Sequence, residues 1–105
     1  MAGFNLDARA RLSIELALTA GRGDPIFARQ QEIDAKAVDI AGAEVDMARK
    51  GSSFDFRLSK AIGLALKPDA GHRERAMKAG IDARACADIE RLAASYVSRS
   101  LSRSA

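Results

Sequence analysis

The stretch DIAGAEVDMARKGSSFDFRLSKAIGLAL, residues 39–66, contains two helical segments with a loop between them. The first segment ends at Gly51, because glycine readily adopts the left-handed conformation that closes a helix. The Ser-Ser-Phe-Asp-Phe loop that follows offers Ser53 or Asp55 as the N-cap of a second helix, expected over about residues 56–67. The inward face of that helix is predicted to consist of Leu58, Ile62 and Ala65.

Helical signals continue toward the N-terminus. A first helix is expected over about residues 6–20, with Asn5 as its N-cap and Gly21 and Gly23 at its end. Asp24 and Pro25 then start a second helix that runs to about Val38, because aspartate caps helices and proline fits the first helical position. The core side of the first helix is predicted to consist of Leu6, Ala10, Ile14, Ala17 and Leu18.

The second helix carries an apolar stripe that we expect to face the core. The stripe consists of Ile26, Ile33 and Ala37, with Phe27, Ala35 and Val38 beside it. Two glutamines, Gln30 and Gln31, fall inside the same arc. Because buried amides need hydrogen-bond partners, these two are expected in the core, at a subunit interface or against a small polar ligand pocket.

Toward the C-terminus, a short helix ends at Gly80 and Asp82 caps the last helix. The apolar face of that helix is predicted to include Cys86, Ile89, Leu92, Ala93, Tyr96 and Val97. The Ser- and Arg-rich tail at about residues 98–105 is expected to be flexible. Alanine and leucine dominate the chain, so residues 1–105 are predicted to form one all-α domain, a compact bundle of five or six helices.

Composition limits the classes of function. With 48% hydrophobic and 30% charged residues, the chain is typical of a globular domain. Its net charge of +3 is spread among interleaved acids, so nucleic-acid binding is not expected. The single Cys86 excludes an intrachain disulfide, and no apolar run approaches the roughly 20 residues of a membrane span. Without an apolar signal near the N-terminus, the expected location is the cytoplasm, and no metal ion or cofactor is expected.

Residues 39–66 resemble the segment after the active-site helix of the alkylhydroperoxidase D-like, or carboxymuconolactone decarboxylase, family. That segment often reads Gly-Leu-Ser-x-x-Glu-Ile-Asp-x-Ala-Arg-x-Gly, followed by a loop with aspartate and an Ala/Leu-rich helix. The matching residues here are Ile40, Glu44, Val45, Asp46, Ala48, Arg49, Gly51 and Asp55, then residues 58–66. The run AMKAGIDARACADIERLA, residues 76–93, is similar to the family's closing unit. The resemblance covers about residues 10–95 and implies the family's helical fold and a homo-oligomer, as a dimer, trimer or hexamer.

The family's chemistry lies just upstream, in a Cys-x-x-Cys motif with a histidine four residues after the second cysteine and a glycine eight residues later. Taking Asp39 as the glycine position places the histidine at Gln31. The two cysteine positions then fall at Asp24 and Phe27, with Pro25 matching a proline common between them. The resemblance therefore implies a site in which all three working groups are replaced.

These replacements bear on activity. A cysteine peroxidase needs one thiolate to attack the peroxide and a second thiol to resolve the product, and neither Asp24 nor Phe27 is a thiol. Gln31 cannot titrate as the histidine of the family's decarboxylases does. Asp24 at a helix N-terminus is expected to be a cap and not a general base. Asp24, Phe27 and Gln31 are thus predicted to mark a vestigial pocket without thiol peroxidase activity.

His72 offers a second register, because it also stands eight residues before a glycine, Gly80. The cysteine positions would then fall at Ala65 and Pro68, and too little chain would follow. The register through Gln31 is therefore favoured. His72 itself is expected to be a solvated surface residue, and Cys86 a buried, inert thiol.

Three hypotheses for function remain open. The favoured one is a catalytically diverged family member, not an enzyme, that acts as an oligomeric binding or structural protein, with a small ligand possible. The alternative is an oxidoreductase, such as a peroxidase-like antioxidant, or a lyase that uses Asp24, Gln31 and His72 in the same pocket. The third is an interaction module whose basic tail, with Arg99 and Arg103, docks on an acidic partner. The Arg-Gly-Asp tripeptide at residues 22–24 is expected to be a chance occurrence.

Overall fold

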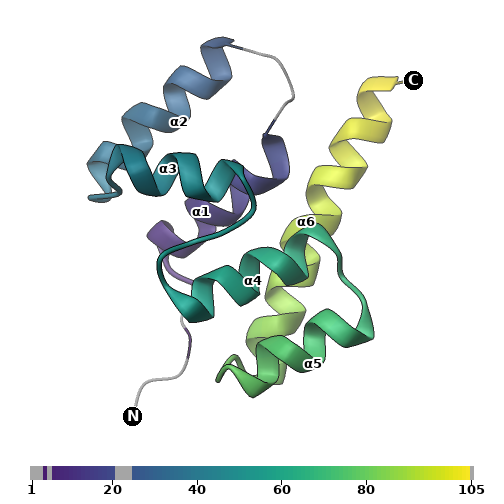
Figure 1. Ribbon diagram of the computed structural model, residues 1–105. Helices are drawn as coiled ribbons and strands as arrows, with labels where there is room; N and C mark the ends of the chain where they lie inside the picture. The colour runs from purple at the N-terminus through teal and green to yellow at the C-terminus, as the bar shows by residue number, and fades with distance from the viewer. Residues whose placement is uncertain (1–3, 5, 21–24, 105) are drawn as a thin grey trace.

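The computed structural model describes residue 4, residues 6–20 and residues 25–104, with side chains up to Tyr96. These residues form six helices and no strand, which confirms the all-α prediction (Figure 1). The helices are α1 (Ala8–Thr19), α2 (Pro25–Ala37), α3 (Gly42–Arg49), α4 (Phe56–Leu66), α5 (Ala70–Lys78) and α6 (Ala83–Ser104). In this part of the chain, none of the helices combines the length and hydrophobicity that a membrane crossing requires.

Aspartate side chains start four of these helices. Asp7 accepts a hydrogen bond from the backbone N–H of Ala10 at 2.9 Å, so α1 begins two residues later than expected. The expected cap Asn5 lies outside the described residues. Asp55, and not Ser53, caps α4, because its carboxylate accepts from the backbone of Leu58 at 3.1 Å. Asp69 and Asp82 act in the same way at the starts of α5 and α6.

A residue in the left-handed backbone conformation follows each of the helices α2, α3 and α5. Gly51 and Gly80 have φ angles of 86° and 106°, as expected for glycines that close a helix. The corresponding residue after α2 is Asp39, which adopts φ 61° although it is not glycine. Asp39 therefore occupies a backbone conformation that favours glycine.

Two three-helix units with matching buried positions build the core. The buried residues of α1 are Ala10, Ser13, Ile14, Leu16 and Ala17, and those of α4 are Leu58, Ala61, Ile62, Leu64 and Ala65. Each buried residue of α4 stands 48 positions after a buried residue of α1. A shift of 41 positions relates Ala35 to Ala76, Ile40 to Ile81, Val45 to Cys86 and Ala48 to Ile89. The helices α1–α2–α3 and α4–α5–α6 therefore repeat one pattern of burial.

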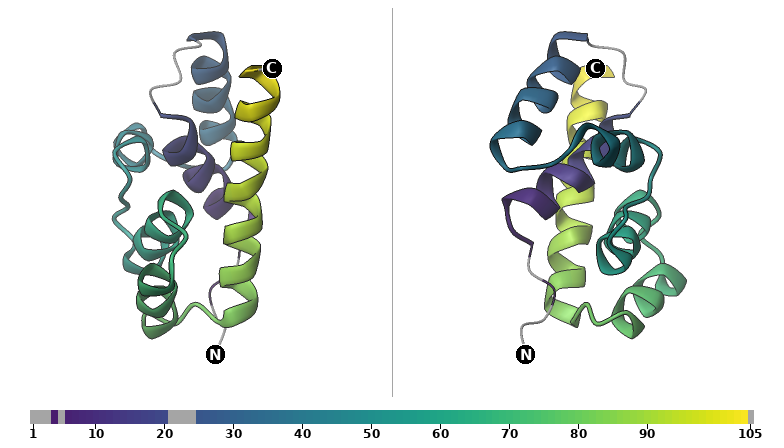
Figure 2. Two further views of the ribbon diagram at one scale, coloured as in Figure 1. Left: turned by 90° about the vertical axis from the view of Figure 1, so that its right-hand side faces the viewer. Right: turned by 60° about the vertical axis from the view of Figure 1, so that its left-hand side comes forward.

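The packing of the helices follows the same repeat. α1 packs on α3 as α4 packs on α6, and α1 and α4 pack on each other in the middle of the molecule. Under the shift of 41 positions, the end of α3 at Arg49 corresponds to Glu90, but α6 continues to Ser104. α6 therefore runs along nearly the whole length of the molecule (Figure 2). The backbone of the tail is helical up to Ser104, whereas its flexibility stays a prediction.

Burial agrees with most of the predicted helix faces. Leu58, Ile62 and Ala65 of α4 are buried, as are Cys86, Ile89 and Ala93 of α6. Ala10, Ile14 and Ala17 of α1 are buried, while Leu18 of α1 and Leu6, which precedes the helix, are half-buried against the core. The side chain of Val97 lies outside the described part of the chain.

The predicted apolar stripe of α2 was wrong, although Ala35 beside it is buried and Val38 packs against the core. Ile26 is 81% exposed and Ile33 is 54% exposed, and Ala37 also faces solvent. The two residues that α2 buries are Gln31 and Ala35. Since two positions in an α-helix turn about 200° around its axis, Ile33 lies on the side opposite Ala35. The apolar stripe therefore points away from the core.

Candidate functional site

The residues of the expected vestigial pocket lie in different environments. Asp24 falls outside the described residues. Phe27 is 44% exposed, whereas Gln31, one turn further along α2, is only 6% exposed. Phe27 therefore lies at the surface, whereas Gln31 lies in the interior.

Gln31 connects α2 to α1 through a short chain of hydrogen bonds. Its side-chain Nε2 donates to Oγ1 of Thr19 at 2.9 Å. The Thr19 hydroxyl in turn donates to the backbone carbonyl of Glu15 at 2.7 Å. The prediction that this amide is buried is confirmed, and its partner is a hydroxyl within the fold. The same prediction was wrong for Gln30 as a core residue, because Gln30 is exposed and donates to Asp34 at 3.0 Å.

His72 is half-buried at the start of α5, in contact with the capping aspartate. Its Nδ1 lies 2.8 Å from Oδ1 of Asp69, and the same oxygen accepts a hydrogen bond from the backbone N–H of His72, also at 2.8 Å. The backbone hydrogen bond, with the ring contact second, holds the pKa of Asp69 below its usual range. The ring therefore contacts the capping carboxylate at the start of α5.

The internal repeat explains why two registers of the family motif fit the sequence. His72 is Gln31 shifted by 41 positions, and Gly80 is Asp39 shifted by the same number. Each pair occupies a helix and its left-handed end, in α2 and in α5. The spacing of eight residues is thus a property of the repeated unit, and it occurs once in each half.

Cys86 is buried in the first half of α6, where its Sγ lies 3.9 Å from the carbonyl oxygen of Ile81. Burial raises the pKa of the Cys86 thiol, because removal from water disfavours the thiolate. The predicted burial is confirmed. A thiol in this environment is a poor nucleophile, since the thiolate is the reactive form.

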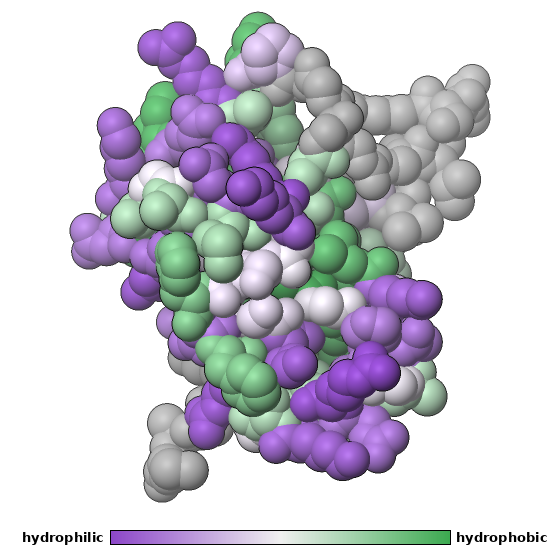
Figure 3. Space-filling view, in the orientation of Figure 1, coloured by the Kyte–Doolittle hydropathy of each residue, from purple (hydrophilic) through white to green (hydrophobic). Residues whose placement is uncertain are grey.

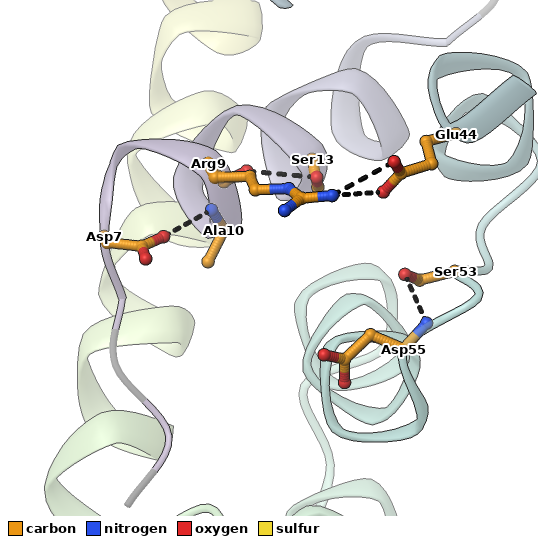
Figure 4. A network of polar contacts seen from close by, with 7 residues as sticks. All are labelled: Asp7, Arg9, Ala10, Ser13, Glu44, Ser53 and Asp55. Carbon is orange, nitrogen blue, oxygen red and sulfur yellow. Dashed lines mark hydrogen bonds and ion pairs between the residues drawn. The ribbon is translucent and has the colours of Figure 1, made fainter. Parts of the chain in front are cut away.

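A polar cleft between α1, α3 and α4 was not predicted from the sequence. Arg9 and Glu44 point toward one another across it, with Nη2 of Arg9 at 3.0 and 2.8 Å from the two carboxylate oxygens (Figure 4). The cavity has a volume of about 330 Å³. Its lining consists of Phe4, Asp7, Arg9, Ala10, Glu44, Asp55, Arg57 and Leu58. No sequence signal joins Arg9 to Glu44, because 35 positions separate them.

The charged groups of this cleft already serve the fold. Asp7 and Asp55 cap α1 and α4, and Glu44 is engaged by Arg9. Arg57 donates from Nε to the backbone carbonyl of Ala79 at 3.1 Å, which ties α4 to the end of α5. Within the described residues, no group of histidine, cysteine, aspartate and glutamate side chains could hold a metal ion. The charged side chains of the cleft therefore cap helices and connect them to one another.

A second cavity, of about 560 Å³, lies between the N-terminal segment and α6. It combines apolar and charged side chains: Phe4, Leu6, Arg11, Asp82, Arg84, Ala85, Asp88, Arg91, Leu92 and Ser95. Asp82 caps α6, and Asp88 lies 3.3 Å from Arg91. The charged residues on the rim are of both signs, so this groove indicates no single class of ligand.

Apolar side chains also reach the surface of the molecule. In the space-filling view, hydrophobic groups stand among strongly hydrophilic ones over α2, and others lie near the start of α4 (Figure 3). Ile26 and Ile33 are the exposed large aliphatic residues of α2, and Phe54 and Phe56 are 67% and 66% exposed before and at the start of α4.

No protein-family model, curated protein or solved structure matches this chain. Function is therefore inferred from the side chains themselves. Among the described side chains are a hydrogen-bonded amide at Gln31, a buried thiol at Cys86, an ion pair between Arg9 and Glu44, and exposed aliphatic groups on α2.

Proposed function

We propose that the chain is a catalytically diverged member of the alkylhydroperoxidase D-like, or carboxymuconolactone decarboxylase, family that acts in the cytoplasm as a homo-oligomeric binding or structural protein. It is not a thiol peroxidase. The observation that carries this proposal is the hydrogen bond from Gln31 to Thr19. At the position where the family places its histidine, this chain has a buried amide whose partner is a side chain of α1.

Two further observations support the proposal. Asp39, which stands at the family's glycine position, adopts the left-handed backbone that glycine favours. The single thiol, Cys86, is buried, and its pKa is raised by burial, so it is a poor replacement for a peroxidatic cysteine. The exposed apolar residues of α2 support the homo-oligomer, because a small chain gains stability by covering such a face.

A peroxide-consumption assay tests the absence of peroxidase activity. The natural chain and Cys86→Ser are compared with and without a dithiol reductant, and neither is expected to exceed the rate of buffer. Consumption by both proteins would overturn the proposal by revealing chemistry at other groups. Consumption by the natural chain alone would overturn it by assigning the activity to Cys86.

A variant that restores the motif tests the family register. Asp24→Cys, Phe27→Cys and Gln31→His are combined, and the triple variant is expected to form a disulfide between positions 24 and 27 and to consume peroxide with a dithiol. The matched control carries the two cysteines and keeps Gln31. A triple variant that neither forms the disulfide nor gains activity over the control would contradict the register.

A further inference from the structure

We propose that α2 is a local opening segment, latched by Arg49, which undocks from α1 and α3 while the other helices stay folded. The latch is defined here as Arg49 of α3 together with its two acceptors on α2, the carboxylate of Glu32 and the backbone carbonyl of Ala28. α2 lies at one edge of the molecule, so it can move without displacing the other helices (Figure 1). The inference concerns a motion of the chain and stands independently of the family and of the oligomeric state.

The buried side of α2 gives the helix little apolar anchoring. The residues that it buries are Gln31, which is an amide, and Ala35, which is small. Ile26 and Ile33, its large aliphatic residues, are 81% and 54% exposed. A helix of 13 residues is marginal in water by itself, and its stability comes mainly from an apolar face packed on its neighbours. The docked position of α2 therefore depends on polar contacts.

Arg49 supplies such contacts from the last turn of α3. Its Nη1 lies 3.1 Å from Oε2 of Glu32, and its Nη2 lies 3.2 Å from the carbonyl oxygen of Ala28. The two acceptors are four positions apart, which is about one turn, so one guanidinium holds successive turns of α2. The planar shape of the guanidinium suits such paired contacts. The hydrogen bond from Gln31 to Thr19 adds a connection to α1 along the same part of the helix.

The second three-helix unit contains the same latch with its charges exchanged. Under the shift of 41 positions, Glu32 corresponds to Arg73, and Arg49 corresponds to Glu90. Nη1 of Arg73 lies 3.3 Å from Glu90, and its Nη2 donates to the carbonyl of Ala83 at 3.1 Å. In both units, one arginine thus joins the second helix to the third through a carboxylate and a backbone carbonyl. The contact is therefore a feature of the repeated unit.

The two units differ in how their second helix meets their first, since α5 packs on α4 more extensively than α2 packs on α1. Gly63 of α4 faces His72 of α5, because an added Cβ on this glycine would lie 3.7 Å from the imidazole ring. Arg57 also ties α4 to the carbonyl of Ala79 after α5. The counterpart of Gly63 in α1 is Glu15, which has a much larger side chain. α5 therefore keeps its contacts with α4 when its latch is removed, whereas α2 depends on Arg49.

Amide hydrogen exchange, followed for each residue by NMR, tests whether α2 opens locally. The amides of residues 29–36 donate within α2, and an undocked helix of this length frays, so their exchange reports undocking. In the natural chain they are expected to exchange at least about tenfold faster than amides in the middle of α4. Equal protection of α2 and α4 would overturn the proposal.

Removal of each latch tests the role of Arg49. Arg49→Gln is expected to speed the exchange of α2 by about tenfold and to leave α4 and α6 unchanged, because only the local equilibrium shifts. Arg73→Gln is the matched control, since it removes the equivalent latch, and a smaller effect on α5 is expected. Faster exchange in every helix of Arg49→Gln would contradict a local latch. An equal effect of Arg73→Gln on α5 would contradict the difference between the two units.

Charge reversal tests whether the attraction across the latch holds α2. Glu32→Arg places two guanidinium groups against each other, and is expected to speed the exchange of α2 more than Arg49→Gln does. Adding Arg49→Glu restores opposite charges, in the polarity of Arg73 and Glu90, and is expected to recover part of the protection. Circular dichroism establishes that each variant is folded. A double variant that exchanges as fast as Glu32→Arg alone would overturn the latch.

Discussion

The side-chain amide of Gln31 donates a 2.9 Å hydrogen bond to the hydroxyl of Thr19, and that hydroxyl donates to the carbonyl of Glu15 at 2.7 Å. The chain of bonds crosses from α2 to α1. It gives the buried amide a partner where the helix turns its aliphatic residues outward. It is one of several contacts that hold α2 in this orientation, together with the hydrogen bonds from Arg49 of α3 to Glu32 and to the carbonyl of Ala28.

Removing the Thr19 hydroxyl alone should destabilise the protein more than removing it together with the amide of Gln31. Thr19→Val leaves the buried amide of Gln31 without its acceptor, and is expected to lower the free energy of unfolding by about 1–3 kcal/mol. The double variant Thr19→Val/Gln31→Leu is expected to recover most of that loss, because two apolar groups replace the pair. Urea unfolding measures both, and the exposed Gln30→Ala serves as control. Equal losses in the single and double variants would count against the bond.

Cys86 is expected to react only when the protein opens. Burial raises the pKa of the thiol and shields its sulfur, so a disulfide reagent should modify it slowly in the folded protein and rapidly in urea. The rate of modification is measured as urea is increased. A rate in the native protein that equals the rate in urea would show that the thiol is accessible.

Asp69 should contribute to the acid sensitivity of the protein. Hydrogen bonds from the backbone and ring of His72 lower its pKa in the folded state. The stabilising effect is therefore fully present above the unfolded pKa of the carboxyl group, and is lost as pH falls through the lower, folded pKa. Asp69→Asn is expected to lose less stability than the natural chain over that acid range. Urea unfolding at several pH values gives the comparison, and parallel curves for the two proteins would exclude the effect.

Gly80 should tolerate no side chain. Its φ of 106° disfavours residues with a Cβ, and an added Cβ would lie 3.0 Å from Nε of Arg57, which bonds to the carbonyl of Ala79. Gly80→Ala is expected to destabilise the protein by about 1–3 kcal/mol. Gly42→Ala is the control, since an added Cβ there meets nothing within 4 Å. Thermal unfolding should give a lower midpoint for Gly80→Ala than for Gly42→Ala.

The Arg9–Glu44 ion pair should add little stability. Its side chains are 50% and 27% exposed, so water and salt screen the attraction. Arg9→Gln is expected to change the free energy of unfolding by about 0.2–1 kcal/mol. The effect should shrink as salt is added. A loss that is large and independent of salt would assign a larger role to the cleft.

The local signals of the sequence were sufficient for the helices and for most of their boundaries. Asp55 and Gly51 predicted the start of α4 and the end of α3, because capping and left-handed closure depend on residues close in the chain. The burial of Ile62 and Ile89 followed from helical periodicity. These features depend on contacts within a few residues, and a sequence records such contacts directly.

Only the tertiary structure decided which way α2 faces and what meets across the cleft. Periodicity places Ile26 and Ile33 on one stripe, but it does not determine whether the core or solvent lies beside that stripe. That choice involves the contacts of α2 with α1 through Gln31 and with α3 through Arg49, and the contact of Arg9 with Glu44 likewise joins positions far apart in the chain. The repeat of buried positions between α1 and α4, by contrast, is also present in the sequence, because Ile-x-Leu-Ala-Leu occurs at residues 14–18 and again at residues 62–66. Signals between residues close in the sequence thus determined the helices. Packing between residues distant in the sequence determined which helix faces are buried and which are exposed.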